Sequence, residues 1–308
     1  MKQKLFIIFS DLDGTFLPLK DDTFNKLVAF IKDLKKTEDV KVKFCPITGR
    51  CADYTLNFMN EINERFKKNG IENVVEFAGS EQGSVVIENK NGKPSIEKVG
   101  IKNKEDLTIF EDVNKFVKNS KYNDYLTVDE DRFCSSFFKV REEVCKLISK
   151  DRIKQIFEEL KKDLLKEFGD KILPTPYRFL FDVTLPKVSK DTAINHILSK
   201  YDRSYNTVGF SYSGDAENDI KAFTYVSKLA EIGGIKAHII LPSNVKECVK
   251  CDELEAWKDK YPDFKKTIEV SQEPLFDGVI DLLRKKLDDK TLVANRKLLS
   301  RSADDLCI

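Results

Sequence analysis

The sequence lacks any long apolar run and any surplus of charge of one sign. No segment approaches the ~20 apolar residues that a membrane-spanning helix needs, and the run at residues 5–9 is too short for the apolar part of a signal peptide. Lysine and arginine number 53 against 52 aspartate and glutamate, so no overall basic field favours nucleic acid. We therefore expect a cytoplasmic protein that binds neither a membrane nor a nucleic acid.

The sequence also lacks a paired framework of cysteines. Its seven cysteines, an odd number, are scattered along the chain, which is typical of a reduced intracellular protein. Cys248 and Cys251 have C-x-x-C spacing, but a zinc site needs four ligands and His238 is their single histidine neighbour. Incidental thiols explain this pair better than a metal or redox role.

The length of 308 residues and the order of the predicted elements indicate two domains, because single cores stop growing at ~250–300 residues. Short apolar strands alternate with amphipathic helices in both outer parts of the chain, which predicts a Rossmann-like parallel sheet covered by helices. The predicted strands are residues 5–9, 40–47, 74–78, 207–213 and 237–241, and the predicted helices are residues 23–34, 54–66, 191–198, 218–227 and 275–287.

The alternation of strands and helices changes between these two parts. Residues 84–99 alternate polar and apolar side chains around Asn91-Gly92, which indicates a β-hairpin. Strand-rich stretches at 125–140 and 177–185 and helical stretches at 107–117 and 142–168 follow. We therefore predict an α/β core of residues 1–87 and 187–308, interrupted by an α+β cap of residues 88–186.

Two carboxylates, Asp11 and Asp13, follow the first predicted strand immediately. Ligands of open α/β sheets bind beyond the carboxyl ends of the strands, which is where these acids would lie. Two acids so close repel each other unless a cation joins them or one of them holds a proton. The alternative is a strand that ends in an ordinary Asp-Gly turn, so the rest of the chain must decide.

Further polar groups lie at the ends of other predicted core elements, with Lys190 just before the helix at residues 191–198. If a helix begins near Asp215, then Asp215, Asn218 and Asp219 share one face by their i, i+3, i+4 spacing. Collected at one sheet edge, four carboxylates need a counter-charge, and hard oxygen ligands of this kind suit Mg²⁺. The groups in question are Thr48 with Gly49, Lys190, and Asp215 with Asn218 and Asp219.

These residues resemble the four motifs of the haloacid dehalogenase superfamily, in the right order. The matching stretches are residues 11–15 (Asp-Leu-Asp-Gly-Thr), Thr48 before Gly49-Arg50, Lys190, and residues 214–219. An insertion between the second and third motifs resembles the branch with an α/β cap (type IIB). That branch includes sucrose-, trehalose- and kanosamine-phosphate phosphatases and a phosphomannomutase.

The resemblance implies a role for each matching residue. Asp11 would attack phosphorus, and Asp13 would protonate the leaving alcohol and then deprotonate water. The metal ligands would be the Asp11 and Asp215 side chains and the Asp13 backbone carbonyl. The supporting residues would be Thr48, Gly49 and Lys190 on the phosphoryl group, and Asn218 and Asp219 behind the metal ligands.

The substrate depends on the cap, where the motifs give no guide. We predict a small phosphorylated sugar, with a disaccharide phosphate among the candidates, because cationic and aromatic side chains suit such a ligand. The alternative for each side chain is a surface position on the cap sheet or, for Arg50, at the end of a core strand. The candidate substrate residues are Arg50, Arg132, Lys139, Tyr177 and Arg178.

Two other functions fit the same motifs. A sugar phosphomutase would use the same aspartyl-phosphate and require a bisphosphate activator. A non-catalytic binding or regulatory protein would keep the fold, but it has no need of the acid/base at Asp13. Residues 79–83 (Gly-Ser-Glu-Gln-Gly) replace the Glu-Asn-Gly or Asn-His-Gly runs of several branches, and Ser211-Tyr212-Ser213 is polar for the end of a buried strand.

Overall fold

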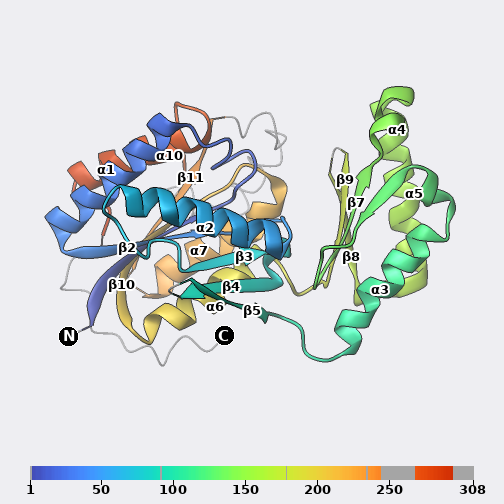
Figure 1. The fold of residues 1–308 in the computed structure, drawn as a ribbon, viewed down its shortest axis with the longest axis horizontal. Coiled ribbons are helices and arrows are strands. Elements are labelled where there is room, and N and C mark those ends of the chain that lie inside the picture. The colour runs from blue at the N-terminus through green and yellow to red at the C-terminus, as the bar shows by residue number, and fades with distance from the viewer. Residues whose placement is uncertain (1, 91, 178, 234, 244–267, 294–308) are drawn as a thin grey trace.

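Figure 1 shows a parallel sheet between layers of helices and, beside it, a smaller body formed by the middle of the chain. This computed structural model describes residues 2–90, 92–177, 179–233, 235–243 and 268–293. The α/β core with an inserted cap is thereby confirmed. Cys248, Cys251 and Arg178 lie outside the described residues.

The core sheet has five parallel strands in the order β12-β11-β10-β1-β2. The side chains of β1 point alternately to the two faces: Phe6 and Ile8 pack against α1, α2 and α10, whereas Ile7 joins the apolar cluster of α6 and α7. Both faces are therefore buried, which explains why β1 is apolar at every position from Leu5 to Phe9. The core elements are β1 (Gln3–Ser10), α1 (Asp21–Glu38), β2 (Val40–Pro46), α2 (Ala52–Lys68), α6 (Lys190–Asp202), β10 (Tyr205–Ser213), η4 (Glu217–Asp219), α7 (Ile220–Gly233), β11 (Lys236–Leu241), β12 (Ile268–Val270) and α10 (Leu275–Asp288).

The third predicted strand does not extend the parallel sheet. It forms β3 (Phe77–Ser80), which lies beside the end of β2 through an isolated bridge of Ile47 with Gly79 and pairs antiparallel with β4 (Val85–Lys90). The reversal follows from η1 (Glu81–Gly83), whose three residues all have positive φ and turn the chain back on itself. β4 then pairs with β5 (Lys93–Lys98), so the predicted hairpin becomes part of a three-stranded sheet.

The cap consists of a four-stranded antiparallel sheet, in the order β6-β7-β9-β8, with helices packed on it. The helical stretch predicted at 142–168 is broken in two, because Ser149 caps the second helix by accepting a hydrogen bond from the N–H of Arg152. The cap elements are α3 (Glu105–Lys118), η2 (Lys121–Asp124), β6 (Leu126–Asp129), β7 (Ser136–Val140), α4 (Glu142–Leu147), α5 (Lys150–Phe168), η3 (Gly169–Lys171), β8 (Leu173–Tyr177) and β9 (Leu180–Thr184).

The apolar contacts of β4 indicate where the cap begins. Val85 and Ile87 of β4 join the apolar cluster of the core helices α1 and α2, whereas the buried apolar cluster of the cap runs from Val113 to Val183. We therefore propose that the cap starts after β5, rather than at residue 88. Each helix in the described part of the chain is too short or too polar to be a candidate membrane span.

Candidate active site

The candidate site lies at the carboxyl ends of the central strands β1 and β10. The backbone N–H of Asp11, which follows β1, donates to the carbonyl of Ser213 at the end of β10 (2.8 Å). Gly14 turns the chain just beyond, with φ of +77°, and lies so close to Asp215 that a Cβ would stand 2.3 Å from Oδ2 of that residue. The strand ends and the glycine together bring acids from two distant parts of the sequence side by side.

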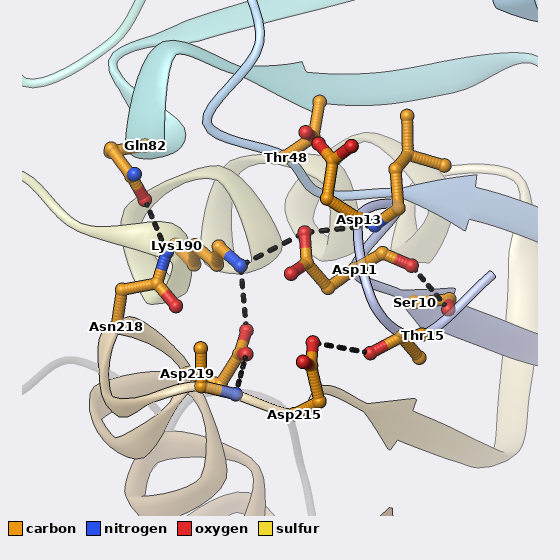
Figure 2. A network of polar contacts seen from close by, with 12 residues as sticks. Ser10, Asp11, Asp13, Thr15, Thr48, Gln82, Lys190, Asp215, Asn218 and Asp219 are labelled. Carbon is orange, nitrogen blue, oxygen red and sulfur yellow. Dashed lines mark hydrogen bonds and ion pairs between the residues drawn. The ribbon is translucent and has the colours of Figure 1, made fainter. Parts of the chain in front are cut away.

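Three buried carboxylates, those of Asp11, Asp215 and Asp219, surround this point with oxygens within 4.8 Å of one another. The Nζ of Lys190, also fully buried, lies 3.0 Å from Oδ1 of Asp11 and 2.7 Å from Oδ1 of Asp219 (Figure 2). Three acids face one lysine, so a cation would balance the remaining charge. The donor set consists of hard carboxylate oxygens, and the group could therefore hold a metal ion.

Asp219 accepts hydrogen bonds at both of its carboxylate oxygens. Its Oδ1 accepts hydrogen bonds from Lys190 and from the hydroxyl of Tyr212, and its Oδ2 accepts from the backbone N–H of Ala216 (3.1 Å). Asp215 accepts a hydrogen bond from the Thr15 hydroxyl at Oδ1 (3.0 Å). The contact of Asp219 with Lys190 favours Asp219 as the residue that orients the lysine.

The pKa of Asp11 shows that the ionised form of this carboxylate is unfavourable in the cluster without a bound cation. Burial, with a smaller effect from Asp219 and Asp215, raises the pKa of Asp11 to about 8, while Lys190 opposes the shift. Burial alone would lower the pKa of Lys190, but the carboxylates of Asp11 and Asp219 raise it. Lys190 therefore stays charged, and a bound dication would favour the ionised form of Asp11 in the same way.

Thr48 and Gly49 reach the site from the end of β2. Thr48 is fully buried, and its N–H donates to the carbonyl of Gly79 (2.9 Å) while its hydroxyl accepts from the N–H of Arg50 (3.2 Å). A Cβ at Gly49 would stand 2.6 Å from Nε2 of Gln82, so the backbone there is closely covered. The structure thus brings Thr48, Lys190 and the acids to one place, as the sequence predicts (Figure 2).

Asp13 points away from the three buried carboxylates. Arg50 donates two hydrogen bonds to the Asp13 carboxylate, from Nε to Oδ2 (2.8 Å) and from Nη2 to Oδ1 (2.6 Å). The guanidinium of Arg50 lies 4.6 Å from the ring centre of Tyr54. Both side chains of the pair are about half exposed. Arg50 is thus engaged with a site residue, and its predicted contact with substrate would require this pair to open.

The predicted cap residues are distributed unevenly. Arg132 is nearly buried, lies over the Phe137 ring and donates to the carbonyl of Gly49, so it joins cap to core. Tyr177 lines a cavity between the two domains. Lys139 is not brought to the site, because its side chain is exposed and its described ion pair is with Glu142 of the cap (3.9 Å). Arg178 lies outside the described residues.

Residues that bind the two domains together are not predicted from the sequence. Glu81 is fully buried and accepts hydrogen bonds from the N–H groups of Phe133 and Cys134 and from the Ser135 hydroxyl. Burial raises the pKa of Glu81, against these hydrogen bonds. Gln82 donates to Asp182 of β9 (2.9 Å). The unusual run at residues 79–83 marks these positions in the sequence, but the local sequence does not predict that they contact the cap.

The family described as haloacid dehalogenase-like hydrolase matches residues 8–230, which include the acids, Thr48, Lys190 and the cap. The chain belongs to this family. The resemblance predicted from the four motifs is confirmed, and the protein is a haloacid dehalogenase-like hydrolase. No curated protein matches the chain in sequence.

Solved structures share the fold of this haloacid dehalogenase-like hydrolase. The sucrose-phosphatase of Synechocystis sp. PCC6803, in complex with sucrose and phosphate, matches with a TM-score of 0.55 at 14% identity, over 92% of this chain and 98% of that one. A haloalkanoate-superfamily phosphatase of Bacteroides thetaiotaomicron matches with a TM-score of 0.53 at 13% identity, over 92% and 95% of the two chains. At such identities the likeness concerns the fold alone.

Proposed function

We propose that this hydrolase is a Mg²⁺-dependent phosphatase that releases phosphate from a sugar phosphate through an aspartyl-phosphate on Asp11. The observation that carries the proposal is the buried contact of Asp11 with Lys190 inside the carboxylate cluster. A nucleophile, a fixed cation and further metal ligands at one point meet the main demands of phosphoryl transfer, which are positioning and charge neutralisation.

In the first half of the reaction, an Asp11 carboxylate oxygen forms a bond to phosphorus while the bond from phosphorus to the ester oxygen breaks. The leaving alkoxide takes a proton from Asp13 and departs as an alcohol. Asp13 cannot donate a proton while both its oxygens accept from Arg50. Entry of substrate is therefore expected to separate Asp13 from Arg50.

In the second half, a water oxygen attacks the phosphorus of the aspartyl-phosphate and Asp13 takes a proton from that water. The bond between Asp11 and phosphorus breaks, which restores the carboxylate and releases inorganic phosphate. Asp13 is half exposed on the open side of the site, where it can exchange protons with solvent and reach the entering water.

Thr48 and Lys190 are proposed to hold phosphoryl oxygens through the hydroxyl and the ammonium group. Mg²⁺, held by Asp11, Asp215 and the backbone carbonyl of Asp13, would supply positive charge that offsets the phosphate. Asp219 then fixes the lysine, since it accepts one hydrogen bond from Lys190 at 2.7 Å.

A sugar phosphate is the proposed substrate class because a cap covers the site and a cavity lies between cap and core. The fold match to a sucrose-phosphatase whose structure holds sucrose and phosphate agrees with this choice. Hydroxyl-rich substrates need several hydrogen-bonding side chains around the leaving group, which a bare core sheet does not offer.

Phosphate release from a panel of phosphate esters, with and without Mg²⁺, tests the proposal. We expect Mg²⁺-dependent turnover of sugar phosphates and a loss of kcat of at least about 1000-fold in Asp11→Asn, because the nucleophile is removed. Asp22→Asn, an exposed acid in the first turn of α1, is the matched control and should leave kcat unchanged.

Two results would count against this function. Turnover of no ester in the panel removes the phosphatase, and an Asp11→Asn variant with normal kcat removes the covalent intermediate. Repeating the panel with an added sugar bisphosphate separates hydrolysis from the mutase reaction, since a mutase would need the bisphosphate and would return the phosphoryl group to a sugar.

A further inference from the structure

A cavity of about 200 Å³ lies between the cap sheet and the core, beside the carboxylate cluster. From the cap, β8 and β9 contribute Thr175, Tyr177, Asp182 and Thr184. From the core, Gln82 and Asn218 face it. Figure 2 shows these two core residues next to Lys190, so the cavity adjoins the place where the phosphoryl group is proposed to bind.

A chain of hydrogen bonds runs along the wall of this cavity. The Nδ2 of Asn218 donates to Oε1 of Gln82 (3.2 Å), and the Nε2 of Gln82 donates to Oδ2 of Asp182 (2.9 Å). One oxygen of Asp182 is thereby fixed against the core. Because Asn218 and Gln82 donate through their NH₂ groups, the Oδ1 atoms of Asn218 and Asp182 are left as hydrogen-bond acceptors in the cavity wall.

Two buried acceptors in this cavity wall have no hydrogen-bond partner among the described residues, namely Oδ1 of Asp182 and Oδ1 of Asn218. Asp182 as a whole is only 2% exposed, so its carboxylate is largely removed from bulk water. A buried acceptor without a donor is unfavourable, and a ligand donor placed in the cavity would remove that cost. Burial also raises the pKa of Asp182, while the positive charge of Arg132 and the hydrogen bond from Gln82 oppose the shift.

We propose that this cavity binds the leaving group of the substrate through its hydrogen-bond donors, hydroxyl or ammonium, and that Asp182 determines this specificity. The inference rests on the proposed phosphatase function and narrows it to polyol or amino-sugar phosphates. A leaving group with a carboxylate or second phosphate would face the Asp182 carboxylate and be rejected. An anionic leaving group would instead bind to Lys221, an exposed cation among the lining residues.

Asp182→Asn gives a sharp test because the substitution keeps the shape and changes the polarity. Gln82 still needs an acceptor, so the new amide oxygen turns to it and its NH₂ group faces the cavity as a donor. We expect kcat/KM for glucose 6-phosphate and glucosamine 6-phosphate to fall at least tenfold more than kcat/KM for p-nitrophenyl phosphate. A larger loss with glucosamine 6-phosphate identifies an ammonium donor, and equal losses identify hydroxyls.

Binding to catalytically silent protein separates this inference from the proposed function. Calorimetric titration of glucose 6-phosphate and glucosamine 6-phosphate into Asp11→Asn and into Asp11→Asn/Asp182→Asn measures affinity without turnover, and at least a tenfold weaker Kd in the double variant is expected. Asp124→Asn, an exposed cap acid, is the matched control and should change neither Kd nor kcat/KM.

The proposal is overturned if Asp182→Asn affects sugar phosphates and p-nitrophenyl phosphate equally, or if Lys221→Met weakens sugar-phosphate binding while Asp182→Asn does not. Preference of the unaltered protein for 3-phosphoglycerate over both sugar phosphates overturns it as well. Absence of turnover with every ester, beside intact Asp182-dependent binding, would instead remove the phosphatase function and leave the specificity site standing.

Discussion

At the scale of single residues, the site depends on one glycine as much as on its acids. Gly14 adopts φ of +77°, and its missing side chain leaves room for the Asp215 carboxylate, whose Oδ2 lies 2.3 Å from where a Cβ would be. A side chain at position 14 would therefore strain the backbone and also collide with Asp215. Only the collision with Asp215 affects the active site, and a glycine elsewhere with a similar φ and no close neighbour separates the two effects.

Gly14→Ala should displace Asp215 and weaken the metal site. We expect the Mg²⁺ concentration for half-maximal activity to rise about 10- to 100-fold, as when a group that orients a metal ligand is lost. Gly70, at the end of α2, has φ of +74° and nothing within 4 Å of a built Cβ. Gly70→Ala therefore carries the backbone cost of about 1 kcal/mol alone and should leave the Mg²⁺ dependence unchanged.

Measuring phosphate release over a range of Mg²⁺ concentrations for both variants checks this prediction. If the two alanine variants lose stability equally and neither shifts the Mg²⁺ dependence, then the contact of Gly14 with Asp215 has no role in holding the metal.

At the scale of elements, η1 is the joint between the two domains. Glu81 and Gln82 have φ of 48° and 58°, unusual for residues with side chains, and both point toward the cap. Glu81 accepts from the loop before β7, and Gln82 donates to β9. Such conformations persist where the surroundings over-determine them, and here the hydrogen bonds to the cap supply that constraint.

Glu81→Gln should loosen the loop of residues 133–135 from the core. The Phe133 N–H donates to both oxygens of Glu81 (2.9 and 3.1 Å) and the Cys134 N–H donates to Oε2 (2.8 Å), so an NH₂ group in place of either oxygen would face a backbone donor, at a cost of about 1–3 kcal/mol. We expect roughly tenfold or faster hydrogen exchange at these amides, measured by mass spectrometry. Glu88→Gln on β4 is the control, since the side chain of Glu88 makes no hydrogen bond or ion pair to any described residue. Unchanged exchange at Phe133 and Cys134 would show that Glu81 does not anchor the cap.

Some of these elements could be predicted from the sequence and others could not. The strand of Leu5 to Phe9 and the meeting of Asp11 with Asp215 were predictable, because a doubly buried strand is apolar throughout and parallel strands end at one edge. The antiparallel pairing of β3 was not, since it depends on three residues with positive φ. The contact of Gln82 with Asp182 spans 100 positions and depends on how the cap docks, which no local pattern encodes.

At the scale of the whole molecule, stability couples to pH through a buried histidine outside the carboxylate cluster. His238 on β11 is 7% exposed, and its Nε2 lies 3.0 Å from the carbonyl oxygen of Leu292, to which it donates in the neutral form. Burial lowers the pKa of His238 to about 4, against 6.5 for the free side chain. The folded protein therefore keeps this imidazole neutral in a range where the unfolded chain binds a proton.

The sign of the effect follows from proton uptake. Between about pH 6.5 and pH 4 the unfolded state holds more protons at His238 than the folded state, so the free energy of unfolding falls as the pH falls. From pH 7 to pH 5 this one group should cost the protein about 2 kcal/mol. His238→Gln keeps an N–H donor and does not titrate, so urea unfolding should show a smaller loss of stability in the variant by that amount. Equal losses in both proteins would mean that the buried imidazole is protonated in the folded state, and that the β11 environment tolerates its charge.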